Sequence, residues 1–214
     1  MILNNKTVDL MTESLEKHEH RDDTAAKMGM WLFIFTEILL FGGLFLVYTV
    51  YRYMYPQDFH YAAMQLNVAF GATNTVILLV SSMTVAMSIT AIQKGNIKLC
   101  MLLIAVTIFL ALFFLVNKYF EWGHKFEFHI YPGSETLLGF KRGVILFFGL
   151  YFFMTGLHAF HVIVGMGLLS VIFFRVKAGK VRPDKFMLLE NGGLYWHLVD
   201  LIWIFLFPLL YLIT

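Results

Sequence analysis

Residues 143–174 read GVILFFGLYFFMTGLHAFHVIVGMGLLSVIFF, without one Asp, Glu, Lys or Arg. A helix needs about 20 apolar residues to cross roughly 30 Å of hydrocarbon, so this stretch predicts a membrane-spanning helix. It also carries two imidazoles near its centre, His158 and His161. Spanning does not require them, and ionisable groups at this depth are costly unless they face a bundle interior or a functional path.

The composition extends this prediction to the whole chain. Apolar residues make up 59% and charged residues 14% of the 214 residues, and the mean hydropathy is +0.74. Such a chain is an integral membrane protein, and its small, scattered net charge of +2 gives no reason to expect nucleic-acid binding. No alternating strand pattern predicts a barrel. We therefore expect an all-α bundle of five transmembrane helices, at Met28 to Val50, Leu66 to Ile92, Leu99 to Phe120, Gly143 to Phe174 and Leu194 to Ile213.

Residues 1–27 are polar and mixed in charge, which is typical of a cytoplasmic tail and not of a secretory signal or a transit peptide. Their composition favours disorder or docking on a partner. Residues 28–214 then form the membrane domain. With the N-terminus inside, eleven basic residues lie in inner segments and five in outer ones, Arg52, Lys118, Lys125, Lys141 and Arg142. The positive-inside rule therefore predicts a cytoplasmic N-terminus and a periplasmic C-terminus.

Glu37 lies deep in the first span and should face protein. Two interpretations remain open: a neutral carboxyl hydrogen-bonded to a neighbouring helix, or a group with a role in proton handling or regulation. His158 and His161 are three residues apart, so they share a helical face and are the expected partners of Glu37. Metal or haem ligation by these histidines would need further ligands at the same depth, and we predict none.

Glu121 and His124 spell Glu-x-x-His at the end of the third span. A di-iron bundle needs two such copies and two more carboxylates, so this pattern does not predict a metal site. His197 and Asp200 share a face at the start of the fifth span, with Trp203 one turn further on. They indicate either a polar cluster under an interfacial tryptophan or a proton entry point.

A basic loop follows the fourth span and includes Arg175 and Lys177. The positive-inside signal alone can account for it, and a pocket for an anionic lipid headgroup is the alternative. We place the candidate lipid contacts at these two residues and at Trp196 and Trp203, which we expect near the membrane interface.

Four segments together resemble subunit III of the haem-copper cytochrome oxidases. They are FTEILLF at residues 35–41, FEW at 120–122, TGLHAFHVIVG at 155–165 and YWHLVDLIW at 195–203. The resemblance runs from about Met28 to the C-terminus and implies the short bacterial form, with five spans instead of seven. It also implies a location in the bacterial cytoplasmic membrane.

The resemblance further implies a non-catalytic accessory subunit without haem or copper, both of which belong to partner subunits. Such a subunit packs against catalytic subunit I, contacts phospholipid and supports proton uptake. Glu37 matches the family's buried glutamate, and Arg175 resembles its headgroup-contacting arginine. The nearest alternatives are the related accessory subunits of quinol oxidases and nitric oxide reductases. An independent transporter would need inverted repeats or broken helices, which the sequence lacks.

Overall fold

The chain is all-helical in a computed structural model, which describes the backbone of residues 5–212 and the side chains of residues 24–212. Five of its helices are long and apolar enough to cross a membrane, which confirms the predicted number of spans. The helices are α1 (Asn5–Met54), α2 (Pro56–Ala63), α3 (Val68–Gln93), α4 (Ile97–Glu127), α5 (Glu135–Leu138), α6 (Arg142–Lys177) and α7 (Met187–Tyr211).

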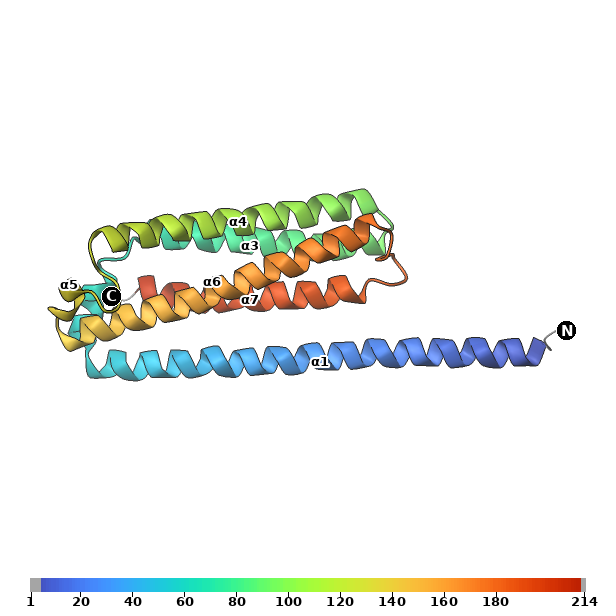
Figure 1. Cartoon of the computed structure of the whole chain (residues 1–214), viewed down its shortest axis with the longest axis horizontal. Helices are drawn as coiled ribbons and strands as arrows, with labels where there is room; N and C mark the ends of the chain where they lie inside the picture. The colour runs from blue at the N-terminus through green and yellow to red at the C-terminus, as the bar shows by residue number, and fades with distance from the viewer. Residues whose placement is uncertain (1–4, 213–214) are drawn as a thin grey trace.

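Four of the long helices form a square bundle. Helices α3 and α6 lie at opposite corners of this square, and each packs on both α4 and α7. Helix α1 lies outside the square, against α6 and α7 (Figure 1). The short helices α2 and α5 both contact α6 at the end of the bundle where α1 finishes (Figure 1). In its most apolar window α7 is 56% buried and α1 only 11%, so α7 is the central element and α1 the peripheral one.

The turn between α3 and α4 shows how the sequence sets the helix ends. Gly95 takes a left-handed conformation with φ of 75°, which a residue with a side chain adopts only at a cost. Asn96 follows as the N-cap of α4, and its side-chain oxygen accepts from the backbone N–H of Leu99 at 3.2 Å. The glycine ends one helix and the asparagine starts the next, so α3 and α4 return side by side.

Small residues let the bundle helices approach closely. A Cβ on Gly165 of α6 would lie 2.9 Å from the Trp196 ring, and one on Gly71 of α3 would lie 2.8 Å from Phe207. Both aromatic side chains belong to α7 and fill the space that each glycine leaves. Gly167, only two residues from Gly165, has nothing within 4 Å of its ideal Cβ, so it serves no such contact within the described chain.

Several helices extend beyond the predicted spans, and the third continues past Phe120 to Glu127. The fifth span begins at Met187 and not at Leu194, because Glu190, expected in the loop, sits in the first helical turn and pairs with Lys27 of α1 at 3.2 Å. His197 and Asp200 therefore lie near the middle of α7 and not at its start. At the other end of the chain, residues 5–27 continue the first span as one unbroken helix (Figure 1).

Candidate functional site

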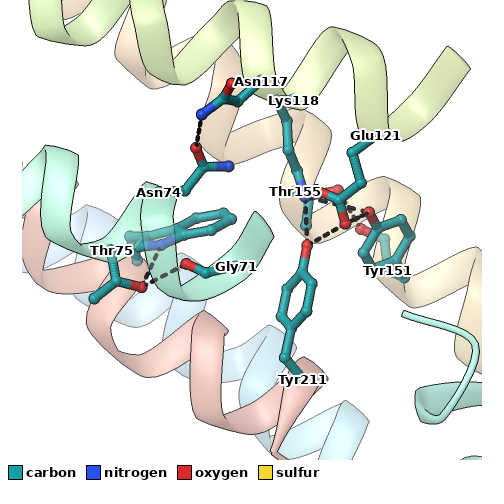
Figure 2. Close-up of polar contacts among 10 residues, drawn as sticks. Gly71, Asn74, Thr75, Asn117, Lys118, Glu121, Tyr151, Thr155 and Tyr211 are labelled. Atoms are coloured by element: carbon teal, nitrogen blue, oxygen red, sulfur yellow. Dashed lines mark hydrogen bonds and ion pairs between the residues drawn. The ribbon is translucent and has the colours of Figure 1, made fainter. Parts of the chain in front are cut away.

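The carboxylate of Glu121 accepts three buried hydrogen bonds inside the bundle. Lys118 donates to its Oε2 at 2.9 Å, and the hydroxyls of Tyr151 and Tyr211 donate to its Oε1 at 2.8 and 2.5 Å (Figure 2). Lys118 and Glu121 are 3% and 4% exposed in their side chains. The four residues come from α4, α6 and α7, so this Lys118 cluster joins three helices at one point.

All three N–H donors of the Lys118 ammonium are used within this cluster. The ammonium also donates to the hydroxyls of Tyr211 at 2.7 Å and Tyr151 at 3.2 Å, and it lies 5.2 Å from the centre of the Trp203 ring. Three donors with three acceptors, over an aromatic face, satisfy an ammonium that is removed from water. The arrangement is therefore a cross-link between helices, with its charges matched inside the chain.

A second layer of polar contacts ties α3 into the same region. The Asn117 amide of α4 donates to the Asn74 side-chain oxygen of α3 at 3.1 Å (Figure 2). The Trp203 indole of α7 donates to the Thr75 hydroxyl of α3 at 3.1 Å. Together with the Lys118 cluster, these bonds connect all four helices of the square.

Glu37 meets one of its two predicted partners. Its Oε2 lies 3.1 Å from Nε2 of His161, and the two side chains are 13% and 10% exposed. The geometry is that of a close charge contact and not of a hydrogen bond. His161 Nδ1 lies 2.8 Å from the carbonyl oxygen of Leu157, and because a carbonyl only accepts, Nδ1 carries a hydrogen.

The contact between Glu37 and His161 joins α1 to α6. It places a carboxyl group against an imidazole with both side chains largely shielded from the surroundings.

His158, the other predicted candidate, does not contact Glu37; the contact is made by His161. His158 is fully buried, and neither ring nitrogen has a hydrogen-bond partner among the described residues. Its ring lies 5.6 Å from that of Phe114 and 5.2 Å from that of Trp203. Its ring therefore packs among aromatic side chains of α4 and α7, while α1 approaches α6 at His161.

His197 and Asp200 form a cluster with Ser82 of α3, which the sequence analysis did not foresee. His197 Nδ1 lies 2.6 Å from the Ser82 hydroxyl, and the Asp200 carboxyl also interacts with that hydroxyl. Asp200 is buried, with one oxygen lacking a hydrogen-bond partner, whereas His197 is half-buried. We name these three residues the α3/α7 notch.

The two tryptophans predicted at the membrane interface lie in the core instead. Trp196 and Trp203 are 1% and 0% exposed, and the Trp196 indole donates to the Ser81 hydroxyl at 3.0 Å. They cannot contact lipid, because α7 is the central helix and turns this face toward α3 and α4. Arg175 and Lys177, the other two candidates, are exposed at the end of α6.

Four polar residues of these clusters were not predicted as site residues, and only Lys118 could have been identified from its position in the sequence. Lys118 was counted as an outer-segment residue, although its spacing of three from Glu121 places both on one face of a helix. Tyr151, Tyr211 and Ser82 gave no such signal, since each comes from another helix. Among the described residues, no group of three or more His, Cys, Asp or Glu side chains could hold a metal ion.

Comparison with known proteins decides the family. The family model described as cytochrome c oxidase subunit III matches residues 1–214. The chain belongs to the cytochrome c oxidase subunit III family. A cytochrome c oxidase subunit 3 of Thermostichus vulcanus is 30% identical over 92% of this chain and 90% of its own length. A probable cytochrome c oxidase subunit 3 of Rickettsia conorii is 29% identical over 95% of this chain and 74% of its own length.

A third relative joins two subunits in one polypeptide. The haem-copper oxidase subunit I+III of Aeropyrum pernix is 29% identical over 87% of this chain, which matches 22% of that longer protein. Membership of the family makes this chain an accessory subunit of a haem-copper oxidase, associated with the catalytic subunit. The Glu37 and His161 pair, the Lys118 cluster and the α3/α7 notch are thus features of a subunit III-family bundle.

Proposed function

We propose that this chain is a non-catalytic subunit of a proton-pumping terminal oxidase that stabilises the haem-copper subunit, contacts phospholipid and supports proton uptake during oxygen reduction. The observation that carries the proposal is the Lys118 cluster. A buried cation and carboxylate whose bonds are all made within the chain are suited to hold helices in place and not to bind a substrate. Haem and copper would then belong to partner subunits.

The proposed orientation places the N-terminus in the cytoplasm and the C-terminus in the periplasm of a bacterial inner membrane. The positions of two lysines support it, since Lys118 and Lys125 are buried within α4 and do not belong to an exposed outer loop. Without them the basic residues divide eleven against three, which is a stronger bias than the sequence count alone.

The proposed role in proton uptake rests on the contact between Glu37 and His161, two side chains of types that can take up and release a proton, near the middle of their spans. Glu37→Gln removes the acid but keeps a polar side chain of the same shape. If Glu37 is only a structural group, the assembled Gln variant pumps protons normally, while Glu37→Leu weakens assembly. A large loss of pumping in the assembled Gln variant, measured in proteoliposomes, supports the proton role, and normal pumping refutes it.

The experiment that tests the function itself is purification of the tagged full chain from its native membrane in mild detergent. The optical redox spectrum and the metal content of the isolated material are the readouts. We expect haem and copper in a larger complex and neither on this chain after dissociation. A cofactor-free chain with no partner overturns the proposal.

The identity of the core subunit in that complex also decides between neighbouring functions. A subunit that oxidises cytochrome c supports the proposed function in full. A quinol-oxidising core or a nitric oxide reductase core keeps the accessory role and changes the electron donor or the substrate.

A further inference from the structure

The α3/α7 notch lies at an unfavourable depth for a surface that faces lipid. Ser82 is near the middle of α3 (Val68–Gln93), and His197 and Asp200 are near the middle of α7 (Met187–Tyr211). Both helices are membrane spans, so the notch lies near the centre of the hydrocarbon layer. Ionisable side chains at this depth normally face protein or water.

Only one side of the His197 ring is bonded within the described chain. Nδ1 contacts Ser82 at 2.6 Å, so the ring edge away from α3 carries Nε2. The residue is half-buried, and helical spacing places it on the same outer stripe of α7 as Leu201 and Ile204, which are 46% and 39% exposed. His197 therefore presents a hydrogen-bonding ring edge on the outside of the bundle.

Whether Ser82 or His197 Nδ1 is the donor in their hydrogen bond, the outer nitrogen of His197 still requires a hydrogen-bond partner. If Ser82 donates to Nδ1, the outer nitrogen of His197 carries a hydrogen and requires an acceptor. If Ser82 donates to Asp200 instead, Nδ1 is the donor to Ser82, and a neutral ring has an outer nitrogen that requires a donor. Lipid tails offer neither, so a polar edge left against them is costly.

The other outer faces of the square are different in character. At similar depth, α4 exposes Phe109 and Leu112, and α6 exposes Phe160 and Ile163. These hydrocarbon side chains suit lipid. The remaining side, between α6 and α7, is covered by α1.

A second partly exposed ionisable group lies on the α1 side of the bundle. Glu37 is 13% exposed, but it is matched within the chain by His161. On the α3/α7 side, by contrast, no further helix of the described chain lies over the bundle, and the outer nitrogen of His197 has no hydrogen-bond partner there.

We propose that the α3/α7 notch is the surface on which the catalytic haem-copper subunit docks, through a hydrogen-bonding side chain that one of its membrane helices presents to His197. The inference rests on the proposed function, since it needs a catalytic subunit as the occupant. One relative carries subunits I and III in a single polypeptide, so the two are held together in that protein. Interfaces within membranes use polar side chains in this way, because a hydrogen bond between helices replaces one that lipid cannot make.

Site-specific photo-crosslinking in the native membrane tests the surface directly. A benzoyl-phenylalanine replaces Leu79 or Leu201, each about one helical turn from the notch and 47% and 46% exposed. The matched controls are Leu112 of α4 and Ile163 of α6, which are 50% and 53% exposed at similar depth. We expect crosslinks to the haem-bearing subunit from the first pair and only lipid adducts from the controls.

Absence of protein crosslinks from Leu79 and Leu201 overturns the inference, whatever the controls give. Crosslinks to the haem-bearing subunit from the controls alone would move the docking surface to α4 or α6 and leave the accessory function intact. Failure to recover any haem protein with the chain, by contrast, would overturn the proposed function as well. Adducts with a quinone instead of a protein would make the notch a small-molecule site.

Substitutions at the notch separate docking from internal stability. His197→Leu should weaken retention of the catalytic subunit through detergent washing by about three- to tenfold, the range expected for one hydrogen bond between helices in a membrane. His197→Gln, which keeps a hydrogen-bonding side chain, should retain most of the catalytic subunit. Ser82→Ala removes the bond to Nδ1 but leaves the outer ring edge, so equal loss of retention in Ser82→Ala and His197→Leu contradicts a docking role for that edge.

Discussion

Glu121→Leu should destabilise the bundle strongly, because it removes the acceptor of three buried hydrogen bonds and leaves Lys118 without its counter-charge. Breaking a buried ion pair by removing one partner costs about 3–5 kcal/mol in water-soluble proteins. In membranes a hydrogen bond between side chains averages about 0.6 kcal/mol, so three such bonds set a lower bound near 2 kcal/mol. We therefore expect a loss of about 2–5 kcal/mol.

The position within this range shows which effect dominates. A loss near the lower bound means that the three bonds act as ordinary membrane hydrogen bonds, and a loss near the upper bound means that the stranded lysine charge dominates. Glu121→Gln keeps an acceptor oxygen for the tyrosines and should cost less than Glu121→Leu. Replacing both charges, Lys118→Met with Glu121→Leu, should be less destabilising than the sum of the two single changes.

The assay is the free energy of unfolding of the purified subunit in mixed micelles titrated with sodium dodecyl sulfate, followed by tryptophan fluorescence. Glu127→Gln is the matched control, since Glu127 also lies three residues from a basic partner on α4 but is 78% exposed in its side chain. That change should stay within about 0.5 kcal/mol of the native chain. The reasoning is refuted if Glu121→Leu also stays within that limit.

Three further outcomes are expected. Gly165→Ala should cost about 1–3 kcal/mol by the same assay, because its Cβ would lie 2.9 Å from the Trp196 ring, whereas Gly167→Ala should be neutral or slightly stabilising. Ser81→Ala should cost about 1–2 kcal/mol, since the buried Trp196 indole would lose its acceptor; an unchanged value would mean that the indole finds another. Arg175→Ala should lower the amount of anionic phospholipid that copurifies, measured by native mass spectrometry, and an unchanged amount removes Arg175 from the lipid site.

The depth of Glu37, His158 and His161 was readable from the sequence, and which partner each one meets was not. Depth follows from counting residues along an apolar span, because each residue rises by about 1.5 Å in a helix. Glu37 and His161 could be proposed as partners on that ground, yet His158 satisfied the same criterion and instead packs against Phe114 and Trp203.

Trp196 and Trp203 were wrongly predicted at the membrane interface because both the start and the rotation of α7 differ from expectation. Tryptophan is common at membrane interfaces, and an assumed start at Leu194 placed both residues near one. The structure begins the helix at Met187, which moves them inward along the span. Rotation then turns both rings into the core, where Gly165 leaves room for Trp196.

The sequence by itself determined the class, the five spans and the family, because these depend on local composition, on span length and on motif order. Only the tertiary structure decided that Tyr151 and Tyr211 join Lys118 at Glu121, and that Ser82 meets His197. Such contacts depend on the rotation and crossing of helices far apart in sequence. Those variables are set by the packing of whole surfaces, so no local pattern of residues records them.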